Sequence, residues 1–380
     1  MGLAACSADM ASFSSKITIA DVARLAGVSK TTVSRYLNGQ FHLLKDETRR
    51  VIEKTIEESG YYPSHSARSL KSQHTCLIGV VIADISTPFS SAVIQGIGNV
   101  LEPQGYVPIF VNCNGDPNKE RQCIADLMAH DVEGLIVNSS SSQSPELLEI
   151  ANSGFPLVLC DRPVEELSCP LVTSDVAKAM GQMLHHLLFS GFALPYLFTE
   201  NPEKSMVRKL RISQFLRLSS QLYQQPIPED HVYVIDTSNG LATRRLLRRI
   251  LDTAQAVPAI LGVNTMTTIH LLGVLKAMGV KIPNEMGVCG PDDWSWGQQL
   301  DWASLIAPGI STIEIPARQI GEQSAEALLS LLSPQDPSAA PAGQTPYDGQ
   351  APAPVLISSR CVLRSSTDLS GSGRGESNRT

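Results

Sequence analysis

Between residues 18 and 27, apolar positions recur at intervals of three and four residues, the spacing of one helix face. These positions are Ile19, Val22, Ala23 and Ala26. Thr18 stands where a hydroxyl can cap the start of a helix, and Gly27 stands where a left-handed residue can end one. The pattern predicts a short amphipathic helix.

A second short helix is predicted directly after Gly27. Ser29 can cap its first turn, and Val33 and Leu37 would face inward. The other positions are polar and mostly short: Lys30, Thr31, Thr32, Ser34 and Arg35. Short hydroxyls and cations near a helix N-terminus suit contacts with base edges and phosphates. The pair therefore predicts a helix-turn-helix whose second helix reads the major groove, although any small helical hairpin would also have capped, amphipathic helices.

A third helix is predicted over residues 46–59 and ends at Gly60. Its inward positions are predicted to be Val51, Ile52, Thr55 and Ile56. Three helices of this size make a minimal all-α headpiece, which we place at residues 16–62.

The run T-I-x-D-V-A-x-x-A-G-V-S-x-x-T-V-S-R-x-L-N at residues 18–38 resembles the DNA-binding headpiece of the lac repressor (LacI/GalR) family of bacterial regulators. The resemblance implies that three residues face base edges: Lys30, Thr31 and Thr32. It implies that three more contact mainly phosphates or bases: Ser29, Ser34 and Arg35. We also count Thr18 and Asn38, at the two ends of the run, among the DNA-binding candidates.

Residues 63–75 resemble the hinge helix of this family, whose pattern is P-N-x-x-A-x-x-L. In the family, the paired hinge helices of a dimer fold on the operator and insert a leucine into the minor groove, which kinks the DNA. The resemblance implies that Leu70 is this wedge and that Ala67 and Arg68 lie at the DNA; Ser64, where the family usually has Asn, is a further candidate contact. A flexible interdomain linker is the alternative, and both readings hold if the segment is disordered alone and helical on DNA.

From Cys76 onward, short apolar strands alternate with helices in two successive blocks. The first block has predicted strands at 77–82, 107–111, 134–137 and 157–159, and helices at 89–101, 119–129 and 144–151. The second has strands at 196–198, 232–235, 259–263 and 287–289, and helices at 176–190, 204–222, 241–251 and 266–277. Repeated strand–helix units predict parallel sheets with helices on both faces, here two Rossmann-like subdomains with a cleft between them.

This region resembles the family's effector domain, which has the two-lobed fold of periplasmic binding proteins. The resemblance rests on four segments: residues 78–90, 116–121, 132–136 and 156–162. It implies an effector-binding and dimerisation domain over residues 76–332, completed by residues 355–367, in which a last strand is predicted at 355–363. Thr265 departs from the family pattern, which usually has Asp at this position.

Three segments are predicted to lie outside the packed domains. Residues 1–15 are expected to be a disordered extension. Residues 333–354 are rich in Pro and Ala and are expected to form an extended surface insertion where the chain returns between subdomains. Residues 368–380 are rich in Ser and Gly, are expected to be disordered and lack a leucine heptad, so we expect a homodimer rather than a tetramer.

Ligands of parallel α/β folds bind beyond the carboxyl ends of the strands. If the family fold holds, polar residues from four such ends converge: Asp84, Ser86 and Phe89 from the first loop, then Asp161 with Arg162, Asn264, and Asp292. Cationic or polar contacts can be added by Ser205, Arg208 and Lys209. Such a mixture suits a polyol, because each hydroxyl both donates and accepts. Each residue alone would also fit an ordinary loop cap or turn.

The segments at residues 292–296 and 308–313 resemble the branch of the family that regulates the use of ketogluconate and 2-keto-3-deoxygluconate. The resemblance implies a sugar-acid effector whose carboxylate meets a cation such as Arg162 or Arg208. Trp294 is a further candidate contact, although Trp294 and Trp296 would equally suit a core or an interface.

The charge distribution agrees with a DNA-binding module on an acidic body. The 380 residues carry a net charge of −7, which by itself argues against a nucleic-acid partner. Residues 16–75, however, contain ten Lys or Arg and six Asp or Glu, a net charge of +4 that leaves −11 for the rest of the chain. A basic end on an acidic body fits an electrostatic footprint confined to one module.

Other function classes find little support in the sequence. No apolar run approaches the roughly 20 residues of a membrane span. The eight cysteines show neither a C-x-x-C motif nor a disulfide framework, which is typical of a cytoplasmic protein. Phosphate-loop and G-x-S-x-G motifs are absent, and the adjacent His185 and His186 would face different directions on a helix. We therefore expect no enzyme activity, no cofactor and no metal.

The sequence thus predicts a bacterial, cytoplasmic transcription regulator that binds a pseudo-palindromic double-stranded operator as a homodimer. It is expected to repress genes of carbohydrate or sugar-acid catabolism under control of a small effector, and to associate with the nucleoid when operator-bound. The alternative is a soluble sugar-binding sensor that acts through protein contacts rather than DNA.

Overall fold

The computed structural model describes residues 17–37, 39–61, 74–296, 300–333 and 352–369. The chain divides into two compact units, residues 1–75 and 76–380. We call the described part of the first unit the headpiece and that of the second the body. Within these ranges, no helix has the length and apolarity that a membrane span requires. The predicted disordered extension and most of the predicted hinge lie outside the described residues.

The headpiece consists of the three predicted helices around a small core. They are α1 (Ile19–Leu25), α2 (Lys30–Leu37) and α3 (Asp46–Ser59), with a short 3-10 helix, η1 (Phe41–Leu43), between the last two. Its buried core is formed by Val22, Ala23, Ala26, Val33, Ile52 and Tyr61. The prediction that Val51 faces inward is wrong: it is 42% exposed, because the buried face of α3 is centred on its neighbour Ile52.

The N-terminal lobe of the body has a parallel six-stranded sheet in the order β13-β5-β4-β3-β1-β2. Its strands are β1 (Leu77–Ile82), β2 (Val107–Asn112), β3 (Gly134–Asn138), β4 (Leu157–Cys160), β5 (Leu171–Ser174) and β13 (Val355–Ile357). Its helices are α5 (Pro88–Leu101), α6 (Pro117–Ala129), α7 (Pro145–Asn152) and α13 (Ala317–Leu332), with η2 (Glu102–Gln104).

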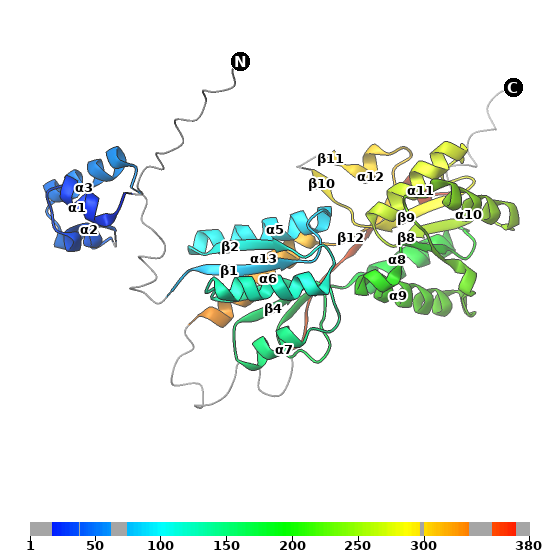
Figure 1. Cartoon of the computed structure of the whole chain (residues 1–380). Coiled ribbons are helices and arrows are strands. Elements are labelled where there is room, and N and C mark those ends of the chain that lie inside the picture. The colour runs from blue at the N-terminus through cyan, green and yellow to red at the C-terminus, as the bar shows by residue number, and fades with distance from the viewer. Residues whose placement is uncertain (1–16, 38, 62–73, 297–299, 334–351, 370–380) are drawn as a thin grey trace, which may run out of the picture. The chain divides into compact units, whose positions relative to one another are not determined.

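Alternate residues of its central strands supply two separate cores. Val80 packs with α5 and α13, and Val81 packs with α6 and α7, because successive strand residues point to opposite faces. The two helix layers lie on either side of the sheet (Figure 1). Glycines let α5 and α13 approach closely: a Cβ on Gly321 would lie 2.2 Å from the carbonyl oxygen of Val93.

The C-terminal lobe repeats this architecture with the strand order β14-β12-β9-β8-β6-β7. Its strands are β6 (Tyr196–Thr199), β7 (Val232–Val234), β8 (Ala259–Gly262), β9 (Gly287–Pro291), β12 (Ser311–Glu314) and the antiparallel β14 (Arg360–Val362), beside a small hairpin of β10 (Ser295–Trp296) and β11 (Leu300–Asp301). Its helices are α8 (Val176–Phe189), α9 (Met206–Tyr223), α10 (Gly240–Thr253), α11 (Thr265–Met278) and α12 (Trp302–Leu305), with η3 (Pro202–Lys204), η4 (Glu229–His231) and η5 (Ser365–Thr367). Helices α8 and α9 pack on one face, α10 and α11 on the other.

The described chain passes between the lobes at three places: after β5, after β12 and after β13. The first and third passages are joined where the amide of Asp175 donates to the carbonyl of Ile357 at 2.9 Å. The predicted single last strand at 355–363 is therefore wrong. Its two halves, β13 and β14, pair with β5 and β12 in different sheets, so the backbone must leave one ladder before it joins the other.

The elements on either side of the predicted insertion are α13 and β13, which both belong to the N-terminal lobe. Residues 334–351 of the insertion and 370–380 of the predicted tail lie outside the described residues.

Candidate functional site

Helix α1 begins at a reciprocal cap between Thr18 and Asp21. The Thr18 hydroxyl and amide donate to Asp21 Oδ2 at 2.7 and 3.1 Å, and the Asp21 amide donates back to Thr18 Oγ1 at 3.4 Å. The bonds from Thr18 lower the pKa of the Asp21 carboxyl, because they favour its charged form. Thr18, a predicted DNA contact, has this capping role in the headpiece.

Ser29 caps the first turn of α2. Its hydroxyl accepts from the amide of Thr32 at 3.1 Å, and the two hydroxyl oxygens are hydrogen-bonded at 2.8 Å. With the start of the helix fixed in this way, three predicted DNA-binding residues form its exposed face: Lys30, Thr31 and Arg35. The predicted contacts Asn38, Ser64, Ala67, Arg68 and Leu70 lie outside the described residues.

An aromatic–cation stack, which the sequence did not predict, joins α2 to α3. The rings of Tyr36 and Phe41 meet edge to face with centroids 5.6 Å apart. The guanidinium carbon of Arg49 lies 4.3 Å from the centroid of Phe41, within the range of a cation–π contact. The stack holds the connection between α2 and α3 in place beside the last turn of α2, which contains Tyr36.

In the body, the N-terminal lobe contributes Asp161 and Arg162, which directly follow β4. The Arg162 Nη1 donates to the carbonyl of Ser139 at 2.9 Å. Glu120, a buried residue of α6, braces this loop by accepting from the Ser139 hydroxyl at 2.7 Å and from the Ser140 amide at 2.5 Å. Arg162 Nε is buried and has no hydrogen-bond partner among the described residues. It lies 3.9 Å from Asp161 Oδ2, an ion-pair contact that is too long for a hydrogen bond, so the described protein leaves this donor unused.

The C-terminal lobe contributes a second group of polar residues. Glu200 follows β6, and its Oε2 accepts from Arg208 Nη2, in a short ion pair, and from Asn264 Nδ2 at 2.9 Å. Asn264 also caps α11 by accepting from the Thr267 amide at 2.8 Å. Asp292 follows β9 and accepts from the Thr265 hydroxyl at 2.9 Å. Thr265, which departs from the family pattern, therefore still serves the site by orienting a carboxylate.

Arg211 projects from the same face of α9 as Arg208, one turn further on. Its Nη1 donates to the carbonyl of Val263 at 2.7 Å, and its Nη2 lies 4.0 Å from Asp292 Oδ1. Its side chain is only 13% exposed. The long distance to Asp292 is an ion-pair contact rather than a hydrogen bond, so the charge of Arg211 is only partly satisfied.

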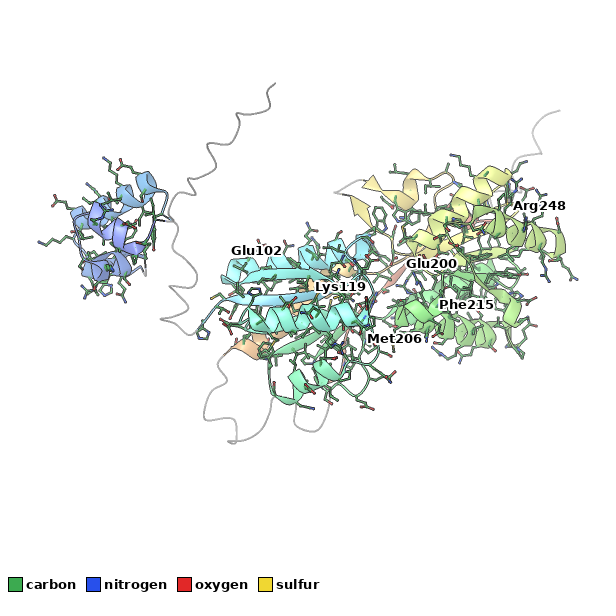
Figure 2. All side chains as sticks on the ribbon, in the orientation of Figure 1. Glu102, Lys119, Glu200, Met206, Phe215 and Arg248 are labelled. Atoms are coloured by element: carbon green, nitrogen blue, oxygen red, sulfur yellow. The ribbon has the colours of Figure 1, made fainter. Side chains whose placement is uncertain are left out.

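The charged residues of the two lobes affect one another's pKa values. Burial raises the pKa of the Asp161 carboxyl, and the charges of Arg162 on its own lobe and Arg211 on the other oppose the rise. Burial likewise lowers the pKa of the Arg162 guanidinium, against the attraction of Asp161. Figure 2 places Glu200 and Met206 on the side of the C-terminal lobe that faces the N-terminal lobe. Three guanidinium groups and several carboxylates thus lie on the sides of the two lobes that face one another, and we call this interlobe region the cleft.

The structure brings together five of the predicted effector-binding residues: Asp161, Arg162, Arg208, Asn264 and Asp292. The other predicted residues have local roles. Asp84 Oδ1 accepts from the amide and hydroxyl of Ser86 in a turn, and Phe89 packs on the core. Lys209 pairs with Glu203 at 2.6 Å on the exposed surface. Trp294 stacks on Trp302 with centroids 6.1 Å apart, and Ser205 precedes α9 without a side-chain cap bond.

Two residues of the cleft, Glu200 and Arg211, were missed by sequence reasoning. Glu200 stands directly after a strand, which is the signal that singled out Asp161 and Asp292. Arg211 lies three residues after Arg208, so the two share a helix face. Among the described residues, no group of three His, Cys, Asp or Glu side chains is placed to hold a metal ion.

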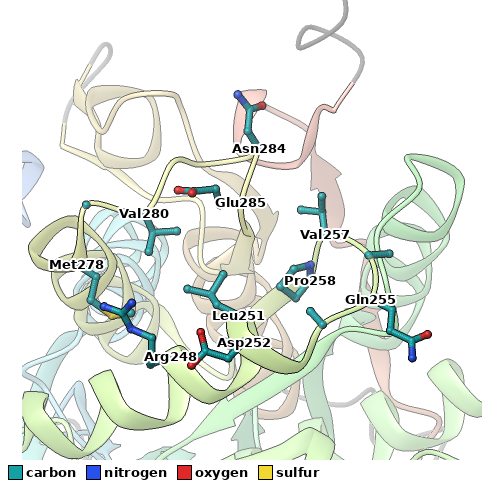
Figure 3. A pocket seen from close by; sticks show the side chains of 13 residues that line it. Arg248, Leu251, Asp252, Gln255, Val257, Pro258, Met278, Val280, Asn284 and Glu285 are labelled. Carbon is teal, nitrogen blue, oxygen red and sulfur yellow. The ribbon is translucent and has the colours of Figure 1, made fainter.

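A separate surface cavity lies at the other end of the C-terminal sheet (Figure 3). Val257 and Pro258 on its wall precede β8, and Glu285 precedes β9. The cavity is thus at the amino ends of the strands, whereas Asn264 and Asp292 are at the carboxyl ends. Because ligands of such sheets bind at the carboxyl ends, the cavity is not the predicted effector site.

Comparison with known proteins agrees with both units. Residues 18–64 match the family model described as bacterial regulatory proteins, lacI family. Residues 75–361 match the model of periplasmic binding proteins and sugar binding domain of LacI family. The second match alone covers more than half of the chain, so it establishes the family.

Individual relatives cover nearly the same span. The transcriptional regulator KdgR of Bacillus subtilis is 31% identical over 350 residues, which cover 92% of this chain and 97% of KdgR. The regulator PtxS of Pseudomonas putida is 34% identical over 317 residues, covering 83% of this chain and 90% of PtxS. Among solved structures, the lac repressor dimer bound to operator has a TM-score of 0.75 at 21% identity and covers 93% of this chain and 100% of its own. The helix-turn-helix headpiece, the two-lobed parallel body and these matches together place the chain in the LacI family of DNA-binding transcription regulators.

Proposed function

We propose that the protein is a homodimeric repressor of sugar-acid catabolism genes, controlled by a sugar acid bound in the cleft between the lobes. Three relatives support parts of this proposal. KdgR and PtxS resemble this chain over most of its length, and the more distant repressor PurR of Vibrio parahaemolyticus is 28% identical over 322 residues, 84% of this chain and 93% of PurR. The protein acts in the bacterial cytoplasm and is nucleoid-associated while it occupies its operator.

In this proposal each headpiece reads one half of a pseudo-palindromic operator. Lys30 and Thr31, exposed near the start of α2, contact base edges, and Arg35 contacts a phosphate or a base. The cap between Ser29 and Thr32 holds the start of the helix so that these side chains keep one orientation. Leu70 of the two hinge segments wedges the centre of the site.

The cleft recognises the carboxylate of the effector through Arg162 and Arg211. This assignment rests on one observation: each lobe has a guanidinium group whose donors the described protein does not fully use, since Arg162 Nε has no hydrogen-bond partner and Arg211 Nη2 lies 4.0 Å from Asp292 Oδ1. The charges of both groups also act on Asp161. Arg208 is the weaker candidate of the two cations suggested by the sequence, because it is already paired with Glu200. A carboxylate that bridges the two lobes binds one interlobe arrangement better than another, which is the requirement for control of a distant headpiece.

Calorimetry on the full chain tests the effector class. We expect 2-ketogluconate, 2-keto-3-deoxygluconate or gluconate to bind, and glucose to bind at least about tenfold more weakly, because a hydrogen bond to a charged group contributes about 1.5–3 kcal/mol. Arg211→Gln should remove this preference. Binding of the neutral sugar alone would show that the effector is not a sugar acid.

A further inference from the structure

Glu200 is the carboxylate that sequence reasoning did not assign, and it has an unusual position for a site proposed to bind an anion. It lies at the carboxyl end of β6, inside the cleft wall, and its side chain is 24% exposed. Both of its protein donors, Arg208 Nη2 and Asn264 Nδ2, bond to the same oxygen, Oε2. Oε1 receives no hydrogen bond from the described chain, so it remains available to a hydroxyl donor.

We propose that Glu200 determines the specificity of the effector site by occupying Arg208, so that the cleft accepts ligands with one carboxylate and rejects ligands with two. The inference rests on the proposed function, namely that a sugar acid binds between Arg162 and Arg211. A linear sugar acid placed there extends its hydroxyl-bearing end along the C-terminal wall toward Asn264 and Glu200. Glu200 Oε1 accepts from a hydroxyl at this end of the ligand.

The charges on the C-terminal wall support the rejection of a second carboxylate. Arg208 and Arg211 are its cations, and Glu200 and Asp292 are its anions, so the wall is neutral overall. Arg208 is neutralised by its own ion pair, and Asn264 has its side-chain amide on Glu200 and its side-chain carbonyl on the Thr267 amide. The carboxylate at the far end of an aldaric acid would thus meet the Glu200 carboxylate without an unpaired cation. Burial strengthens the repulsion, because screening is weak inside the cleft.

Removal of the charge on Glu200 should convert the wall into a second anion site. In Glu200→Gln, the side-chain oxygen of the glutamine can still accept from Asn264 Nδ2. Arg208, however, loses its counter-ion and becomes available to a ligand carboxylate. The matched control is Glu203→Gln, which also removes one carboxylate charge. Glu203 pairs on the exposed surface with Lys209, the neighbour of Arg208 on α9. An exposed pair of this kind has little energetic effect.

Calorimetric titration of the full-length proteins with 2-ketogluconate, gluconate and the diacid glucarate tests the proposal. The wild type should bind glucarate at least about tenfold more weakly than the better monoacid, and E200Q should reduce this ratio about tenfold, whereas E203Q should leave it unchanged. The double variant E200Q with Arg208→Gln should restore the rejection of glucarate. The wild-type ratio is independent of whether any variant folds.

The results of these titrations distinguish a failure of the role assigned to Glu200 from a failure of the proposed sugar-acid effector. Equal wild-type affinity for monoacid and diacid, or an unchanged ratio in a folded E200Q, overturns the role of Glu200 and leaves the sugar-acid proposal standing. Failure of all the monoacids to bind the wild type overturns both. A loss of rejection in E203Q as large as in E200Q would show that overall charge, rather than the Glu200–Arg208 pair, sets the specificity.

Discussion

Asp161 and Asp292 occupy equivalent positions in the two lobes. Each directly follows the third strand of its sheet order, β4 or β9, and each has a backbone φ of 70°, in the left-handed region. The Asp161 amide donates to Val172 on β5 at 2.7 Å, and the Asp292 amide donates to Ile313 on β12 at 2.8 Å. The same turn thus places one carboxylate on each wall of the cleft, and Asp161 interacts electrostatically with both Asp292 and Arg211.

Replacement of Asp161 by Asn should stabilise the unliganded body at neutral pH. The pKa of Asp161 is raised in the native protein from its usual value of 3.8, so ionisation of the native carboxylate costs stability as the pH rises through this range. Asn removes the charge and tolerates positive φ. The unfolding midpoint of D161N should exceed that of the wild type at pH 7, and the difference should shrink as the pH falls toward 4. A lower midpoint at pH 7 would contradict the assignment.

Comparison of Asp161→Ala with Asp161→Asn separates the effect of the left-handed backbone conformation from the effect of the charge. Alanine also removes the carboxylate, but it has no short polar side chain to support the left-handed conformation. Thermal unfolding at neutral pH should therefore place D161A below D161N. Equal midpoints would show that the left-handed turn contributes little to the difference.

Substitution of Arg364 should be among the most destabilising changes in the C-terminal lobe. Its Nη2 donates to both oxygens of Asp293, at 3.1 and 3.0 Å, and to Asp301 at 2.5 Å, while its Nη1 donates to the carbonyl of Ile310 at 2.9 Å. Its side chain is 15% exposed. Arg364→Met leaves two partly buried carboxylates without their cation, so urea unfolding should show a loss of about 3–5 kcal/mol.

Arg360 is the control for this prediction. It pairs with Glu314 across β14 and β12, but its side chain is 75% exposed. Arg360→Met should cost about 1 kcal/mol or less, because water already solvates the exposed guanidinium group. Similar losses in the two variants would show that burial does not distinguish these ion pairs.

Lys30→Ala should weaken specific operator binding and relax sequence preference. Lys30 is exposed in the first turn of α2, where a base contact contributes about 1–3 kcal/mol of discrimination. Lys54→Ala is the control, because Lys54 lies on α3 in a pair with Glu58 at 3.7 Å. Fluorescence anisotropy with operator and scrambled duplexes at fixed salt should show reduced discrimination only for K30A. Equal losses of discrimination in the two variants would show that the effect comes from the positive charge of the headpiece rather than from a base contact of Lys30.

The headpiece was predictable because its determinants are local. The caps at Thr18 and Ser29 and the spacing of Val22, Val33 and Ile52 define three helices without reference to distant residues. Helix α13 was not predicted, although its buried positions recur at intervals of three and four residues. Its close approach to α5, where Gly321 leaves no room for a side chain, is not visible in a local pattern. The division of residues 355–363 between two sheets was not predictable either, because a strand pattern does not reveal which partner strand it pairs with.

The cleft was only partly predictable for a related reason. Residues that follow strands can be recognised in the sequence, and Asp161, Asn264 and Asp292 were found in this way. The pairing of Arg208 with Glu200 and the contact of Arg211 with Asp292 depend on how α9 packs, which local patterns do not specify. The sequence therefore suggested Arg208 as a free cation, whereas the structure shows it paired.

The central claim is that a sugar acid between Arg162 and Arg211 controls operator affinity. The most direct measurement is anisotropy titration of the full chain with an operator selected from genomic DNA, with and without saturating 2-ketogluconate. The account predicts a change in operator affinity of at least about fivefold in the wild type, and no change in Arg211→Gln that still binds operator. An unchanged wild-type affinity at saturating ligand, or an equal change in R211Q, would contradict it.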